Sequence, residues 1–133
     1  MTDGLHAYLS YREPEAALTW MARLGFPVIS RVETGDGALQ HAEVRVGSGV
    51  VMVAGFDDDY ESPRLRRRSV GYGLYVTTDD VDGRYEQALD AGSRPVIVPE
   101  ETPWGGRRAR VLDPGGYEWS FGDYRPGSTA PAD

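Results

Sequence analysis

The chain has 133 residues, a length that fits one domain with one hydrophobic core. Its 14 basic and 21 acidic residues give a net charge of −7, which disfavours nucleic acid as a partner because the phosphate backbone would be repelled. The absence of cysteine excludes disulfides, thiolate metal sites and cysteine nucleophiles, and no apolar run approaches the ~20 residues of a membrane span.

The N-terminal residues indicate a protein without a secretion signal. Met1-Thr2-Asp3-Gly4 provides neither a basic region nor an apolar region, so we expect a cytoplasmic location and no membrane partner. All 14 basic residues are arginine, which excludes Schiff-base and lysine-nucleophile mechanisms. No phosphate loop or dinucleotide glycine motif is present, and we expect no cofactor.

The first half of the chain reads as a strand, a helix and three further strands. The first strand is predicted at His6–Tyr11, and a helix begins at Glu13-Pro14, since proline is tolerated in a first helical turn. Its apolar residues recur at helical spacing, and Gly25 ends it as a C-cap glycine does. The remaining strands are predicted at Val28–Val32, Leu39–Val46 and Gly49–Ala54.

The second half repeats this order. A strand is predicted at Gly71–Thr77, and Thr78-Asp79-Asp80 offers N-cap side chains for a helix that runs to Ala91 and is capped by Gly92. The turn Asp113-Pro114-Gly115-Gly116 separates the last two strands. The three strands after the helix are predicted at Pro95–Val98, Arg107–Leu112 and Glu118–Gly122.

The two halves form an internal repeat. A shift of 67 positions takes Glu13 to Asp80 (80 − 13), Gly25 to Gly92 and Gly49 to Gly116. We therefore predict an α+β fold with two βαβββ units, which together form a curved mixed sheet, a half-barrel with outer helices and an inner cleft. The predicted single domain spans 1–124, with repeat one at 5–55, a connector at 56–69, repeat two at 70–124 and a flexible tail at 125–133.

Strand alternation predicts which side chains line the cleft. In the strand 39–46 the apolar positions face the helix, which directs His41 and Glu43 into the cleft, and the repeat places Arg108 and Arg110 opposite them. Charged groups in a cleft must be paired or bound to a ligand, so Glu43 and Arg110 are expected to meet each other or the ligand. The other predicted cleft residues are His6, Tyr8, Tyr75, Glu118 and Ser120.

Trp104 stands in a loop between Pro103 and two glycines. Because an exposed tryptophan is unfavourable, it should be buried, either as a lid on the core or a dimer interface, or as a stacking surface for a planar ligand. These two interpretations are equally supported. The tryptophans Trp20 and Trp119 are expected in the core.

Three stretches resemble the vicinal-oxygen-chelate superfamily, which comprises the glyoxalases, the extradiol dioxygenases and the bleomycin-resistance proteins. They are His6–Pro14, Val76–Asp82, and Thr102–Gly105 together with Asp113–Gly122, and the resemblance covers about residues 5–124. The run D-P-G-G-Y-x-W-x-F-G is characteristic of the superfamily, although it does not specify an activity.

Metal-using members of that superfamily hold their ion through four residues in the cleft. The resemblance maps these positions onto His6, Gly73 (Tyr72 if the register slips by one), Met52 or Val53, and Ser120, of which only His6 is a competent ligand. A catalytic divalent ion needs about three protein ligands. The resemblance therefore implies the metal-free binding branch, whose members are expected to be homodimers that hold a drug in clefts shared between chains.

The sequence thus favours a binding protein over an enzyme. It would hold a small molecule, such as an antibiotic or an aromatic metabolite, between Tyr8, Tyr75, Trp104 and the charged cleft residues. A metal-independent lyase or isomerase that uses His41 and Glu43 as an acid–base pair is the alternative, since the i, i+2 spacing puts both on one strand face. The same pair could instead be a structural ion pair across the sheet. A metal enzyme with ligands shifted by one position is a third hypothesis.

Overall fold

A computed structural model describes residues 4–55 and 73–127 of the chain. The connector predicted at 56–69 and positions 128–133 of the predicted tail lie outside the described residues. Within the described part, Arg125 of the predicted tail pairs with Asp79, with 2.9 Å between its Nη2 and the aspartate Oδ1.

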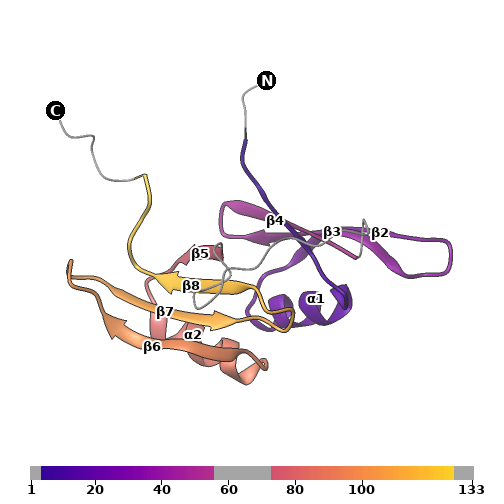
Figure 1. Cartoon of the computed structure of the whole chain (residues 1–133). Helices are drawn as coiled ribbons and strands as arrows, with labels where there is room; N and C mark the ends of the chain where they lie inside the picture. The colour runs from indigo at the N-terminus through magenta and orange to yellow at the C-terminus, as the bar shows by residue number, and fades with distance from the viewer. Residues whose placement is uncertain (1–3, 56–72, 128–133) are drawn as a thin grey trace, which may run out of the picture.

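Repeat one forms a four-stranded sheet of its own with one helix. The strand order is β1-β4-β3-β2, in which β1 runs parallel to β4 and the other pairs are antiparallel (Figure 1). The predicted elements are confirmed with shifts of one or two residues at their ends. They are β1 (Ala7–Ser10), α1 (Pro14–Arg23), β2 (Val28–Glu33), β3 (Leu39–Val46) and β4 (Gly49–Ala54).

Repeat two forms a second sheet with the same connectivity, in the order β5-β8-β7-β6. The sheets are separate rather than continuous, so the predicted α+β fold with two βαβββ units is confirmed as two open sheets. Asp80 caps the second helix, since its side chain accepts a hydrogen bond from the Gly83 backbone N–H. The elements are β5 (Gly73–Thr77), α2 (Val81–Asp90), β6 (Arg94–Glu101), β7 (Arg107–Leu112) and β8 (Glu118–Gly122).

The 67-residue repeat holds through the third strand of each unit and then changes. The helices begin at Pro14 and Val81, which are 67 positions apart (81 − 14). In the last strand, however, Tyr8 pairs with Met52 while its equivalent Tyr75 pairs with Ser120, an offset of 68 (120 − 52). Four residues separate the paired positions Arg45 and Val50, whereas five separate the equivalent pair Leu112 and Glu118, so the predicted equivalence of positions 49 and 116 is wrong by one.

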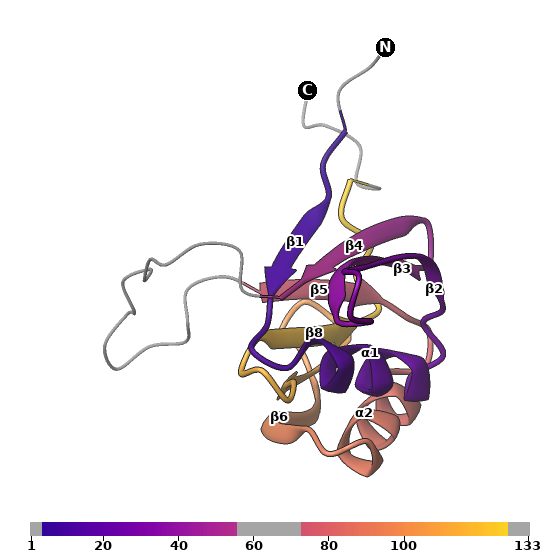
Figure 2. The same cartoon turned by 90° about the vertical axis from the view of Figure 1, so that its right-hand side faces the viewer.

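The core lies where the helices cover one face of each sheet. Helices α1 and α2 lie side by side and contact each other, as both views show (Figures 1 and 2). Trp20 on α1 packs edge to face on Trp119 of β8 with ring centroids 5.0 Å apart, and its Nε1 donates to Ser93 Oγ at 2.6 Å. Both indoles are buried as predicted, and the first repeat's helix therefore completes the second repeat's core.

A buried carboxylate also connects the repeats. Asp113 Oδ2 accepts hydrogen bonds from Tyr11 Oη at 2.6 Å and from Trp119 Nε1 at 2.9 Å. Its Oδ1 accepts from the backbone N–H groups of Gly115 at 2.9 Å and Tyr117 at 3.0 Å, which fixes the turn before β8. Burial, and after it the neighbouring Asp113, raises the pKa of Tyr11 well above its ordinary value.

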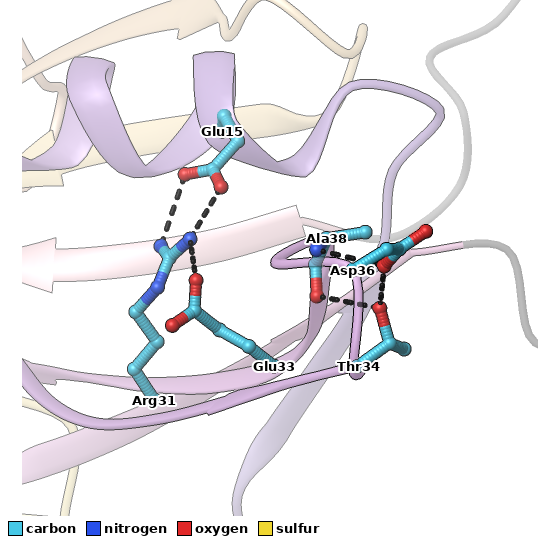
Figure 3. Close-up of polar contacts among 6 residues, drawn as sticks. All are labelled: Glu15, Arg31, Glu33, Thr34, Asp36 and Ala38. Carbon is cyan, nitrogen blue, oxygen red and sulfur yellow. Dashed lines mark hydrogen bonds and ion pairs between the residues drawn. The ribbon is translucent and has the colours of Figure 1, made fainter.

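An arginine on β2 ties the outer edge of sheet one to its helix. Arg31 Nη1 and Nη2 lie 3.0 Å and 2.5 Å from the two carboxylate oxygens of Glu15 on α1, and Nη2 also reaches Glu33 at 3.3 Å (Figure 3). The hydrogen bonds from Arg31 lower the pKa of Glu15 below its ordinary value. In the adjacent turn, the Thr34 hydroxyl donates to Asp36, which closes the β2–β3 hairpin (Figure 3). No helix among the described residues is long and apolar enough to cross a membrane.

Candidate functional site

The candidate site is a cavity of about 590 Å³ on the face of sheet two that faces away from α2. This volume falls in the range of small-molecule pockets. Every lining residue belongs to repeat two. They are Tyr75, Ile97, Thr102, Trp104, Arg107, Arg108, Ala109, Arg110, Ser120, Asp123 and Tyr124.

Strand alternation on β7 places two arginines on the floor of this cavity. Ala109 and Val111 are buried against the helix side, which turns Arg108 and Arg110 to the opposite face, as predicted. The sheet register sets Arg110 beside Ser120 on β8, and Arg110 Nε donates to Ser120 Oγ at 2.8 Å. Strand alternation predicts Ser120 as a cleft residue, and in the structure Ser120 is the neighbour that orients Arg110.

Tyr75 forms one side of the cavity because β8 has a glycine beside it. The phenol ring lies so close to Gly122 that a Cβ there would collide with it. Tyr75 Oη donates to the Tyr124 backbone carbonyl at 2.8 Å, which fixes the ring across the sheet. Burial raises the pKa of Tyr75, so the phenol is neutral near pH 7 and acts as a hydrogen-bond donor.

Two of the three lining arginines are paired with carboxylates. Arg108 Nε lies 2.9 Å from Glu100 Oε1 on the neighbouring strand β6. Arg107 reaches Asp82 on α2 through Nε at 2.6 Å and Nη2 at 2.8 Å, and these bonds lower the pKa of Asp82. Asp123 accepts the backbone N–H of Arg107 at 3.0 Å. The cavity thus combines aromatic surface with arginines that ion pairs hold in place.

Trp104 is not buried within its own chain, so the interpretation as a lid on the core is wrong, whereas the dimer-interface and ligand-stacking interpretations stay predictions. Its side chain is 66% exposed in the turn between β6 and β7 and lines the rim of the cavity. The Arg108 guanidinium lies over the ring, with its Cζ 5.9 Å from the centroid, and partly covers it. An exposed aromatic at a cavity rim fits a stacking surface or an interface.

The site residues predicted in repeat one lie on the corresponding face of sheet one, away from this cavity. His41 and Glu43 are half-buried neighbours on β3, with 3.6 Å between Nε2 and Oε2. Tyr8 on β1 lies 49% exposed beside Met52. Arg110 does not contact Glu43 within the chain, since the two residues lie in different sheets and bond to different partners.

Two further predicted site residues, His6 and Glu118, lie neither in the repeat-two cavity nor with the group on sheet one. His6 is exposed and precedes β1, so it does not share the ordered strand with Tyr8. Glu118 begins β8 as a buried residue, and it does not line the cavity. His6 precedes β1 and Glu118 is the first residue of β8, and at the end of a strand the alternation that predicted them no longer fixes the direction of a side chain.

The sequence did not single out the residues that close the cavity at its ends. Ile97 on β6 lies beside Arg110, but β6 is irregular near this point, so simple alternation fails there. Thr102 is fixed in the hairpin turn, where its Oγ1 accepts the Gly106 N–H at 2.8 Å. Asp123 and Tyr124 follow the last strand, and long-range hydrogen bonds fix them there, from the Arg107 backbone N–H to Asp123 and from Tyr75 to the Tyr124 carbonyl.

The residues at the superfamily's metal-ligand positions do not fit a divalent ion. Met52 and Ser120 lie beside Tyr8 and Tyr75 in the register, and Gly73 carries no side chain. Among residues 4–55 and 73–127, no group of three or more His, Asp or Glu side chains could hold a metal ion. These residues therefore do not provide the ligands of a catalytic metal site.

Comparisons with known proteins identify the family of the chain. Residues 5–121 match the Glyoxalase/Bleomycin resistance protein/Dioxygenase superfamily. The chain is 34% identical over 101 residues to the Mycobacterium bovis protein Mb0911c, a match that covers 71% of this chain and 64% of that protein. A Mycobacterium tuberculosis protein, Rv0887c, is also 34% identical, with 58% of its length covered. The match therefore spans about three fifths of these relatives.

Solved structures share the fold. TioX from Micromonospora sp. ML1 superimposes with a TM-score of 0.70 at 28% identity, over 92% of this chain and 100% of that one. A bleomycin-binding protein solved in complex with bleomycin gives a TM-score of 0.63 at 21% identity, over 93% and 100% of the two chains. At that identity the second likeness shows the fold alone.

Proposed function

Because the chain belongs to the Glyoxalase/Bleomycin resistance protein/Dioxygenase superfamily, we propose that it binds a flat, partly apolar small molecule in the repeat-two cavity without a metal ion. The observation that carries the proposal is the lining itself. Tyr75, Trp104 and Tyr124 supply aromatic surface, while Arg108 and Arg110 supply directed donors. Aromatic sides select planar molecules, and the charged groups fix their orientation.

The ligand class that fits is an aromatic metabolite or an antibiotic. A protein of the same fold binds bleomycin, which supports the use of this scaffold for sequestration. No step of bond making is needed for that role, and a binding protein is therefore the function we favour. We also expect the protein to act in the cytoplasm.

The cavity has a floor and sides but is open on one face, which supports a homodimer with shared clefts. None of its lining residues comes from repeat one. The corresponding face of sheet one presents Tyr8, His41 and Glu43, of which Tyr8 is exposed and the other two are half-buried. In a dimer, that face of a second copy would cover the cavity, and light scattering at micromolar concentration should then give about twice the 14.6 kDa chain mass. A monomer at that concentration contradicts the shared cleft.

The proposal that no metal ion is needed rests on the residues at the four mapped ligand positions. His6 stands alone among the four mapped positions, and about three ligands are required. Elemental analysis of untagged protein should find no stoichiometric zinc, nickel, manganese or iron. A bound metal whose chelation lowers the melting temperature would refute metal independence.

Calorimetry on Trp104→Ala tests the proposed binding site. With the best ligand from a panel of aromatic drugs and metabolites, the loss of stacking should weaken binding by about 1 kcal/mol or more. Val98→Ala is the matched control, because Val98 is 62% exposed in the same sheet and does not line the cavity. Equal affinities of Trp104→Ala and the parent chain would place the ligand elsewhere.

A metal-independent lyase or isomerase is the second candidate. The 3.6 Å separation of His41 and Glu43 brings a base and an acid together on one sheet face. Product analysis of the bound panel compounds separates the two functions. Unchanged compound recovered from the parent chain supports the binding protein, whereas conversion that Glu43→Gln abolishes supports the enzyme.

A further inference from the structure

The cavity contains one guanidinium group whose charge is not balanced. Arg107 and Arg108 are paired with Asp82 and Glu100. Arg110 bonds instead to a neutral hydroxyl, that of Ser120. Among the described residues no carboxylate lies within ion-pair distance of Arg110, although it is half-buried at the floor of the cavity.

The geometry leaves the outer part of Arg110 available. A guanidinium has five N–H donors, and the bond from Nε to Ser120 Oγ uses one of them. The two Nη groups donate to no described residue. Since Nε is held from the side by the neighbouring strand, the two Nη groups remain as a planar pair of donors, the arrangement that binds a carboxylate or sulfonate through two parallel hydrogen bonds.

Asp123, the carboxylate among the lining residues, and Glu100, the partner of the lining Arg108, are already engaged. Glu100 is held by Arg108, and Asp123 accepts the Arg107 backbone N–H. Neither is within hydrogen-bond distance of Arg110. A half-buried cation without a counter-ion is unfavourable, so a bound anion would gain both the hydrogen bonds and the charge compensation.

We infer that Arg110 is the anchor for an anionic group, and that the ligand is a planar aromatic acid whose ring lies between Tyr75 and Trp104. This inference rests on the proposed binding function and specifies its ligand class. The net charge of −7 gives the protein an overall field that repels anions. Selectivity for an acid must therefore come from Arg110 itself.

A matched pair of probes isolates the charge. 2-Naphthoate and 2-naphthamide have the same ring system and nearly the same shape, and only the first carries a charge. Calorimetric titration of the full chain should show naphthoate binding at least about tenfold more tightly, as expected for one charge-assisted hydrogen-bonded pair. Raising the salt concentration should weaken naphthoate binding and leave naphthamide binding nearly unchanged.

The variants Arg110→Gln and Arg94→Gln distinguish the anchor from a general charge effect. Both remove one positive charge from sheet two, but Arg94 is exposed at the start of β6 and does not line the cavity. Arg110→Gln should remove the preference for naphthoate, whereas Arg94→Gln should change either affinity by less than about twofold. Arg110→Lys should restore part of the preference, since a single ammonium replaces the planar pair of donors. Melting temperatures of all three variants confirm that they are folded.

The outcomes separate this inference from the proposed function. If naphthoate and naphthamide bind equally and Arg110→Gln changes neither, the anion anchor is wrong while the aromatic binding function stands. If neither probe binds and no panel compound does, both statements fail. If Arg110→Gln leaves probe binding unchanged but dissociates a dimer, Arg110 is an interface residue that pairs with a second copy, and the anchor is overturned.

Discussion

Repeat one and repeat two have the same elements in the same order, yet the pocket of ligand size among the described residues lies on the open face of repeat two. In the register, His41 and Glu43 of repeat one take the places of Arg108 and Arg110 in repeat two, and Met52 takes the place of Ser120. The backbone is therefore not what makes the pocket. Side chains enclose the space, namely Arg108 and Arg110, Trp104 in the β6–β7 turn, and Tyr75 beside Gly122. A duplicated fold can thus keep its packing face and change its chemistry on the other face.

The largest expected difference is between two tryptophans. Trp20 joins the repeats and is 1% exposed, so Trp20→Ala should lower the free energy of unfolding by about 3–5 kcal/mol. Trp104→Ala should change it by less than about 0.5 kcal/mol, because no core contact is lost. Urea denaturation of both variants measures this. A large destabilisation by Trp104→Ala would mean that the β6–β7 hairpin is structural rather than part of a binding site.

The turn before the last strand should also behave differently in the two repeats. Asp113→Ala removes an acceptor that Tyr11 and Trp119 share, and two buried donors left unsatisfied should cost about 3 kcal/mol of stability. Ser48→Ala, in the shorter turn of repeat one, should cost less than about 0.5 kcal/mol. Chemical denaturation gives both values. Equal effects would show that Asp113 does not join the repeats energetically.

The C-termini of the two helices should contribute equally to stability, unlike the open faces of the two sheets, which differ. Gly25 and Gly92 follow α1 and α2 with φ of 84° and 101°, in the left-handed region that a Cβ disfavours. Gly25→Ala and Gly92→Ala should each destabilise the chain by about 1–2 kcal/mol, with values close to each other. Thermal unfolding compares them. A much larger effect at one site would mean that one repeat carries more of the stability than the other.

The smallest effect concerns the carboxylates in the first turn of each helix. Glu15 and Asp82 are 67 positions apart (82 − 15), and each is bonded to an arginine of its own sheet that lowers its pKa. Since the folded pKa of Glu15 is below its ordinary value of 4.5, its bond with Arg31 contributes stability above pH 4.5 and loses it as the pH falls through the lowered pKa. Arg31→Gln should return the pKa of Glu15 toward 4.5 and leave Asp82 unchanged. An NMR titration of the side-chain carboxyl carbons measures both, and a pKa of Glu15 that does not rise would show the pair is broken in solution.

Much of this protein was determined by the sequence by itself. Helical spacing, the two capping glycines and strand alternation specify the two βαβββ units and their buried faces, because these signals are local and periodic. They also place Arg108, Arg110 and Tyr75 on the open face of sheet two.

The sequence could not determine that His41 and Glu43 lie away from the cavity, since alternation gives a face and not the position of one sheet relative to another. Only the tertiary structure decided that Trp104 is exposed, that Asp123 and Tyr124 close the pocket, and that Arg110 has a hydroxyl rather than a carboxylate beside it. Those facts depend on the register between strands and on how far a hairpin extends, which arise from contacts between residues far apart in the chain.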